Sequence, residues 1–64
     1  MNLLDIIDHR VIKKRHMGTY WKYLIETCQT YFVMVFSNDM ETVIWECVFF
    51  DLKSAIYAFN HFKQ

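Results

Sequence analysis

The hydrophobic residues of the chain recur with two different periods. Near both ends they repeat every three or four positions, as on the buried face of a helix, and between residues 19 and 50 they alternate, as in a strand. The first stripe lies before the single glycine and predicts a helix over residues 3–16, which Gly18 would end in the left-handed conformation. Its members are Leu3, Leu4, Ile7, Val11 and Ile12.

Three alternating segments follow this predicted helix. They predict strands over about residues 19–27, 30–37 and 41–50. Cys28-Gln29 makes the first turn, and Ser37-Asn38-Asp39 makes the second with side chains that hydrogen-bond locally. Because both connections are short, we expect neighbouring strands to run antiparallel.

The last segment predicts an amphipathic helix over residues 52–63. Asp51 precedes it and can accept hydrogen bonds from the free amides of the first turn. Its apolar stripe consists of Leu52, Ala55, Ile56, Phe59 and Phe62. The chain is therefore predicted to form one small α+β domain over residues 1–64, in the order α-β-β-β-α, with a three-stranded antiparallel meander packed by helices.

This order of elements resembles that of double-stranded-RNA-binding domains. Those domains carry a lysine-rich start to the second helix, whereas the equivalent stretch here is Asp51-Leu52-Lys53-Ser54, with one lysine and an acid. The Gly-Pro loop between their strands is absent too. The resemblance covers only the order of elements, so we do not assign the chain to that family.

The predicted sheet carries more apolar surface than two short helices can cover. The middle strand, residues 30–37, has no charged residue on either face, although an antiparallel sheet that is wet on one side normally alternates apolar with polar residues. If both helices cover the same face, the other one exposes a large apolar set, which marks an interaction site. The alternative is that the helices pack on opposite faces and leave a monomer without such a site. The expected interface residues are Tyr31, Phe32, Met34, Phe36, Trp45 and Phe49.

Composition strengthens this expectation of a partner. The chain has only 64 residues, of which 55% are hydrophobic and 19% aromatic, and its formal net charge is zero. So small a domain buries only ~60% of the surface of its unfolded chain. A net charge near zero also favours self-association. We therefore expect a homodimer that also binds a host protein.

The basic segment over residues 9–16 suggests an alternative function. Arg10, Lys13, Lys14 and Arg15 could contact phosphates and make the chain a small nucleic-acid-binding protein. The opposing interpretation is a solvated helix end whose positive charges interact favourably with the helix dipole. We favour the second interpretation because no further basic stripe continues the segment.

The sequence offers little for catalysis or metal binding. The histidines and the two cysteines, Cys28 and Cys47, lie at irregular separations without a CxxC pair, so we expect free thiols, no metal and no cofactor. No nucleophile motif with a glycine-rich oxyanion loop is present, so we expect no enzyme. The first residues carry Asp5 and Asp8 and no basic leader, which predicts a cytoplasmic location in the host cell.

These observations lead to one functional hypothesis. We expect a non-enzymatic protein-protein interaction module, of the kind that a phage or mobile element uses to bind and block a host protein. This expectation rests on the small size of the chain and on its excess of apolar surface.

Overall fold

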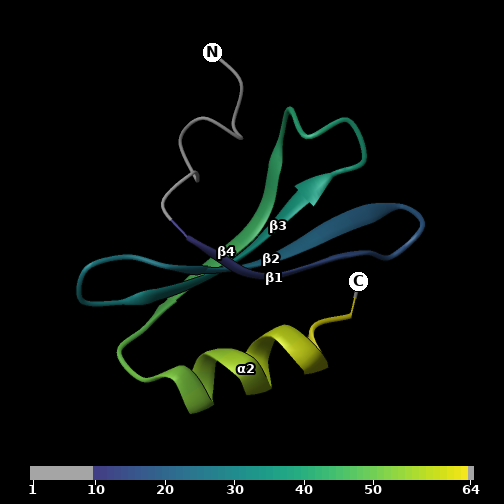
Figure 1. The fold of residues 1–64 in the computed structure, drawn as a ribbon. Helices are drawn as coiled ribbons and strands as arrows, with labels where there is room; N and C mark the ends of the chain where they lie inside the picture. Colours follow the sequence, from purple (N-terminus) through teal and green to yellow (C-terminus); the bar gives the residue numbers. More distant parts are fainter. Residues whose placement is uncertain (1–9, 64) are drawn as a thin grey trace.

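The computed structural model describes residues 10–63, which form a four-stranded antiparallel sheet and one helix (Figure 1). The elements are β1 (Val11–His16), β2 (Tyr20–Glu26), β3 (Tyr31–Ser37), β4 (Val43–Phe49) and α2 (Leu52–His61). The strand order β1-β2-β3-β4 follows the chain, so the sheet is a simple meander. Helix α2 lies across one face of the sheet and contacts β2, β3 and β4.

The predicted order α-β-β-β-α is wrong, because residues 11–16 form a strand and not the end of a helix. The remainder of the predicted helix over residues 3–16 falls largely on residues 1–9, which lie outside the described residues. Gly18 explains the error. Its φ of +88° suits the end of a helix, but here it is the middle one of the three residues between β1 and β2, and glycine is equally favoured in the turn of a hairpin. The fourth strand also removes the resemblance to the element order of double-stranded-RNA-binding domains.

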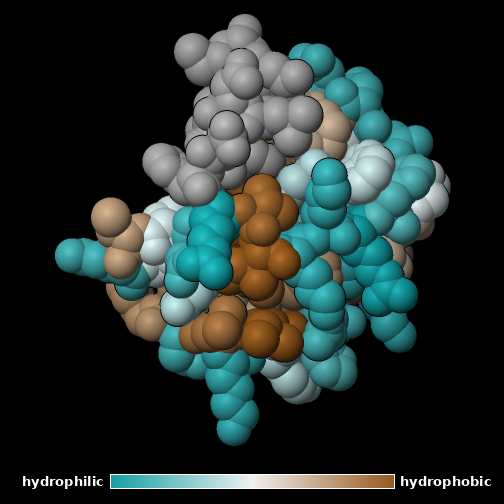
Figure 2. Space-filling view, in the orientation of Figure 1, coloured by the Kyte–Doolittle hydropathy of each residue, from teal (hydrophilic) through white to brown (hydrophobic). Residues whose placement is uncertain are grey.

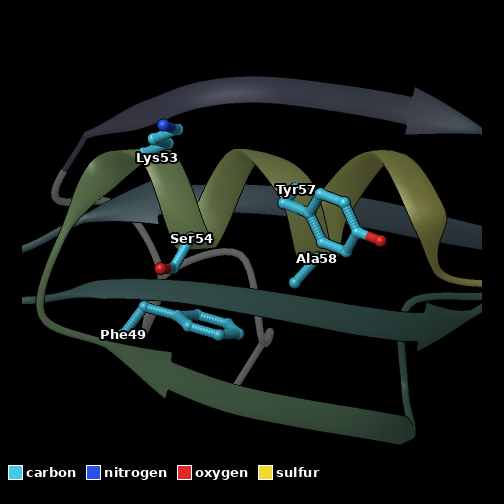
Figure 3. A pocket seen from close by; sticks show the side chains of 5 residues that line it. All are labelled: Phe49, Lys53, Ser54, Tyr57 and Ala58. Atoms are coloured by element: carbon cyan, nitrogen blue, oxygen red, sulfur yellow. The ribbon is translucent and has the colours of Figure 1, made fainter.

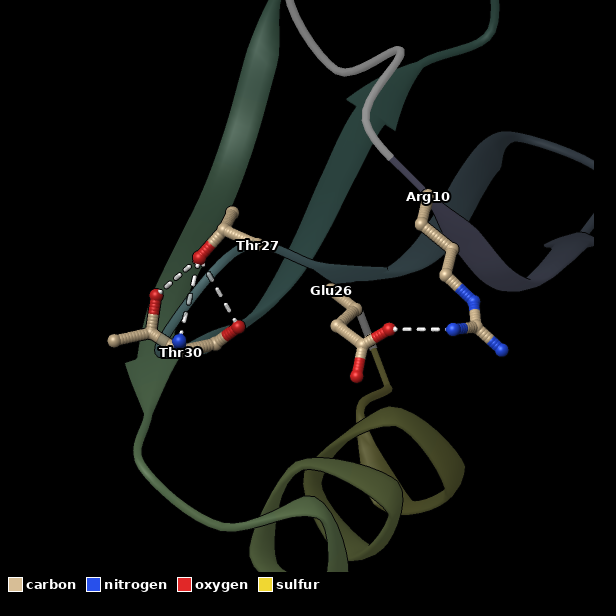
Figure 4. Close-up of polar contacts among 4 residues, drawn as sticks. All are labelled: Arg10, Glu26, Thr27 and Thr30. Carbon is tan, nitrogen blue, oxygen red and sulfur yellow. Dashed lines mark hydrogen bonds and ion pairs between the residues drawn. The ribbon is translucent and has the colours of Figure 1, made fainter.

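The other predicted elements are confirmed to within one or two residues. The β2–β3 hairpin turns at Cys28-Gln29, where the Thr27 amide donates to the Thr30 carbonyl at 2.9 Å. The two threonine hydroxyl groups lie 2.8 Å apart and help to close this turn (Figure 4). At the β3–β4 turn the Ser37 hydroxyl donates to Asp39 at 2.6 Å.

The helix begins where the sequence predicts. The Asp51 carboxylate accepts a hydrogen bond from the Ser54 amide at 2.8 Å and caps the first turn. The Phe62 amide donates to the Ala58 carbonyl at the other end. Of the predicted apolar stripe, only Ala55 and Phe59 are fully buried, whereas Leu52 and Ile56 stay exposed.

The core has two parts, one on each face of the sheet. Under the helix, Leu24 and Val33 pack against Ala55 and Phe59. On the opposite face Tyr23, Ile25 and Phe36 are buried among partly buried neighbours, which are Trp21, Phe32, Met34, Met40 and Val43. Among the described residues no helix is long and apolar enough to cross a membrane.

Candidate protein interface

The two edges of the sheet have opposite chemical character. Strand β1 is exposed along its whole length and carries the basic run Lys13-Lys14-Arg15. Lysine on an edge strand discourages pairing with another strand. Strand β4 contains no lysine, arginine or proline, and its only charged residue is Glu46. Within the described residues β4 has a hydrogen-bonded neighbour on one side only, so its outer backbone groups are free to pair.

Large apolar side chains stay exposed along β4 and beyond its end. Phe50 is 81% exposed, Tyr57 66%, and Val48 44%. Ile44 and Trp45 are each more than a third exposed. We call the set Ile44, Trp45, Val48, Phe49, Phe50 and Tyr57 the β4 edge surface.

Alternation along the strand distributes this surface over both faces of the sheet. Trp45 and Phe49 stand opposite Val35 and Tyr31, on the face that the helix covers. Glu46 and Val48 stand opposite Met34 and Phe32, on the other face. Because the residues from Trp45 to Phe49 pair with β3 without interruption, this part of the edge is regular. The one register shift lies nearer the start of β4, between Val35 and Phe36 on the partner strand.

A shallow groove of about 370 Å³ lies between α2 and β4. Phe49 forms its wall on the strand, and Tyr57 and Ala58 form its wall on the helix (Figure 3). Lys53 and Ser54 line the groove at the first turn of the helix. The groove is therefore mainly apolar and adjoins the free edge of the sheet.

Hydrophobic side chains gather elsewhere on the surface as well. Figure 2 shows them in a continuous strip at the centre of one face of the molecule, with hydrophilic side chains on both sides. Among the described residues, Val11, Ile12, Leu52 and Ile56 are each exposed by more than a third. Exposed apolar surface is thus abundant on this small domain, as its composition predicts.

The six predicted interface residues do not form one patch. Tyr31, Trp45 and Phe49 lie on the helix face, whereas the remaining three, Phe32, Met34 and Phe36, lie on the opposite face. Phe36 is fully buried, and Phe32 and Met34 are half-buried against the core of that face. Trp45 and Phe49 are the predicted residues that belong to the β4 edge surface.

Val48, Phe50 and Tyr57 are not among the six expected interface residues, although alternation places Val48 and Phe50 in one of the two apolar sets that the predicted sheet could expose. Phe50 follows β4 directly and precedes the helix cap Asp51, whereas the sequence placed it inside the predicted strand over residues 41–50. Tyr57 lies outside the predicted apolar stripe of the helix, and its 66% exposure fits that position. For Val48, alternation predicted the face of the sheet on which the side chain lies. The sequence did not show that its strand is at the edge of the sheet.

The structure separates the four predicted nucleic-acid-binding residues. Arg10 pairs with Glu26 at 3.0 Å (Figure 4). The Lys13 amine lies over the Phe59 ring, 5.7 Å from its centroid, on the helix face of the sheet. Arg15 pairs with Lys22 across the strands and shares that face, whereas Lys14 pairs with Tyr23 and faces the other way. The four charges therefore do not form a single basic ridge.

Lys22 shares the helix face with Lys13 and Arg15, but its side chain is buried. Its side chain is only 2% exposed, and its amine donates to the Phe59 carbonyl at 2.6 Å. That carbonyl belongs to the last turn of α2, where no intrahelical donor is in place. Desolvation by burial lowers the pKa of Lys22, and the nearby charges of Arg15 and Lys13 lower it further. The buried lysine thus provides a hydrogen-bond donor for a carbonyl group in the last turn of the helix.

No group of histidine, cysteine or acidic residues within positions 10–63 is arranged to hold a metal ion. Cys28 and Cys47 are both free. No protein-family model, no curated protein and no solved structure matches this chain.

Proposed function

We propose that this protein is a non-enzymatic interaction module that binds other protein chains through the β4 edge surface. The observation that supports this most directly is the contrast between the two sheet edges. Edge strands present unpaired backbone groups, and β1 carries the lysines that discourage pairing, whereas β4 does not. A chain that adds a strand to β4 would gain main-chain hydrogen bonds and would cover exposed apolar side chains.

The exposed aromatic residues add to this support. Phe50 and Tyr57 are large side chains at high exposure beside the groove or the edge. Aromatic residues are enriched at the centres of protein interfaces, where they contribute most of the binding free energy. A protein of this size acts most simply by occupying a surface of a larger protein. Inhibition of a host protein, in the cytoplasm, is the role that we propose for it.

Site-specific photo-crosslinking tests this proposal. The photoreactive amino acid benzoylphenylalanine replaces Phe50 or Tyr57 in the protein expressed in its source cell, and crosslinked products are identified by mass spectrometry. Both positions are exposed, so the fold should tolerate the replacement. We expect protein adducts from positions 50 and 57.

The matched control carries the same photoreactive group at position 14, on the basic edge of the sheet. We expect no protein adduct there. Nucleic-acid adducts from position 14, together with none from positions 50 and 57, would contradict the proposal and support nucleic-acid binding through the basic strand.

A further inference from the structure

We infer that the β4 edge pairs with the β4 edge of a second copy, so that two sheets join into one continuous antiparallel sheet of eight strands, centred on Cys47. This inference rests on the proposed function and names one partner for the same surface. The free strand is seven residues long. With a two-fold axis, one interface pairs the free edge of both copies at once. Two-fold symmetry is the commonest arrangement of homodimers.

Symmetry restricts how two β4 strands can pair. Residues that stand opposite each other in an antiparallel ladder point to the same face of the sheet, so a two-fold pairing must be centred on one residue and its own copy. The two-fold axis is then perpendicular to the sheet. Both helices consequently lie on the same face of the joined sheet.

The side chains of β4 select one of these registers. Pairing centred on Glu46 would place two carboxylates opposite each other, which is unfavourable. A centre at Trp45 would bring the irregular start of β4 into the middle of the ladder. A centre at Val48 would place Trp45 opposite Asp51, an acid that already caps α2. A centre at Cys47 avoids all three.

The register centred on Cys47 gives the exposed apolar residues apolar partners. Trp45 stands opposite the partner's Phe49, and Ile44 stands opposite the partner's Phe50, by the counting of an antiparallel ladder. Phe49 lines the groove between α2 and β4, so the Trp45 ring of the second copy lies at the side of that groove. Glu46 stands opposite the partner's Val48. Among the pairs formed within β4 this is the one mismatched pair, and it occurs twice because of the symmetry.

The mismatched pair provides a test that depends on the register. Val48→Lys would place a cation opposite Glu46 of the second copy at both symmetric positions, whereas Val48→Glu would place an anion there. Val48 is 44% exposed, so the single chain should tolerate either residue. Two cross-strand charge pairs of typical strength predict that the dimer of Val48→Glu dissociates at least about tenfold more readily than that of Val48→Lys.

Analytical ultracentrifugation of the full chain measures this difference, and circular dichroism verifies that both variants are folded. We expect the wild type and Val48→Lys to be dimers and Val48→Glu to dissociate. A monomeric wild type would overturn the inference. Equal dissociation constants for the two variants would overturn the proposed register.

A chemical crosslink tests the centre of the ladder independently. Cys47 stands opposite its own copy in the inferred dimer, so a short bismaleimide should join two chains of Cys28→Ser at this position. The matched control, Cys47→Ser, keeps the exposed Cys28 in the β2–β3 loop and should yield little crosslinked dimer. Equal crosslinking of both variants would contradict a centre at Cys47.

Failure of this inference can be distinguished from failure of the proposed function. A monomeric chain that still gives adducts with a foreign protein from position 50 removes the second copy as partner and leaves the proposed function supported. A monomeric chain without any protein adduct from positions 50 and 57 overturns both.

Discussion

Single residues in this domain are positioned by partners far away in the sequence. Lys22 is the clearest example, because its amine is held by the carbonyl of Phe59, 37 residues later. The same amine lies 4.9 Å from the centroid of the Phe59 ring. A charged amine is costly to bury, so this hydrogen bond and the interaction with the ring offset part of the cost.

Because Lys22 is buried, the free energy of unfolding should change with pH in the alkaline range. Its pKa in the folded protein lies below the usual 10.5, so the unfolded chain keeps this proton to higher pH than the folded one. The free energy of unfolding should therefore rise with pH from the folded-state pKa up to about 10.5. We expect this rise to be smaller in Lys22→Met, because methionine carries no ionisable group.

Urea denaturation of the wild type and of Lys22→Met at several pH values up to about 10.5 measures the slope. Burial raises the pKa of Tyr23, and that shift lowers stability as pH rises through the usual tyrosine range, but Tyr23 is present in both proteins and its effect cancels in the comparison. The control variant is Lys14→Met, which removes an exposed lysine from β1. Equal slopes in the wild type and Lys22→Met would show that the buried amine does not cause the effect.

At the scale of elements, capping and turn residues determine where each segment begins and ends. Asp51 starts α2, and the hydrogen bonds from the amide and hydroxyl groups of Ser54 hold the pKa of its carboxyl group below the usual 3.8. Gly18 has a positive φ and lies in the turn that connects β1 to β2. Met40 is the non-glycine residue with positive φ in the β3–β4 turn, where Asp39 accepts hydrogen bonds from Ser37 and from the Glu41 amide.

The cap of α2 can be tested by two substitutions at Asp51. Asp51→Ala removes the acceptor, so the helix should fray and the melting temperature should fall. Asp51→Asn keeps a capping oxygen and should stay close to the wild type at neutral pH.

The stability of the wild type and that of Asp51→Asn should respond differently to acidic pH. The folded pKa of Asp51 is lowered, so its ionised form contributes stability above about pH 3.8 that is lost as pH falls through the folded-state pKa. Asp51→Asn should lack this loss. Thermal melts followed by circular dichroism at neutral and acidic pH measure both effects. A melting temperature of Asp51→Ala equal to that of the wild type would contradict the capping role.

The whole molecule has little interior for the apolar surface that it carries. A core lies on each face of the sheet, yet large side chains such as Phe50 and Tyr57 remain exposed. The formal net charge is zero, so the molecule has no overall repulsion to keep copies apart. Assembly through β4 would cover much of this surface and would leave the basic β1 edge at each end of the joined sheet.

Assembly should appear in the thermal stability of the protein. A dimer dissociates as its chains unfold, so its melting temperature rises with protein concentration. We expect this rise for the wild type over a hundredfold range of concentration, and a much smaller one for Val48→Glu. Differential scanning calorimetry measures it. A wild-type melting temperature independent of concentration would indicate that folding is not coupled to association.

The sequence by itself determined the parts of the fold that depend on neighbouring residues. The three strands from Tyr20 to Phe49 follow from alternation, and α2 follows from its period and from the cap at Asp51. The excess of apolar surface also follows from composition, although its location does not. These features depend on local backbone preferences and on hydrophobic periodicity, both of which are present in the order of residues.

The tertiary structure decided the features that depend on distant contacts. Residues 11–16 form a strand because β2 lies beside them and satisfies their backbone groups, whereas their pattern alone also fits a helix. Helix α2 covers the face that carries Lys22, Leu24 and Val33, and its last turn supplies a carbonyl for the lysine amine. Among the strands of residues 10–63, β4 is an edge because β1 adds to the other side of the sheet. Pairing, burial and edge position are non-local, so no window of sequence contains them.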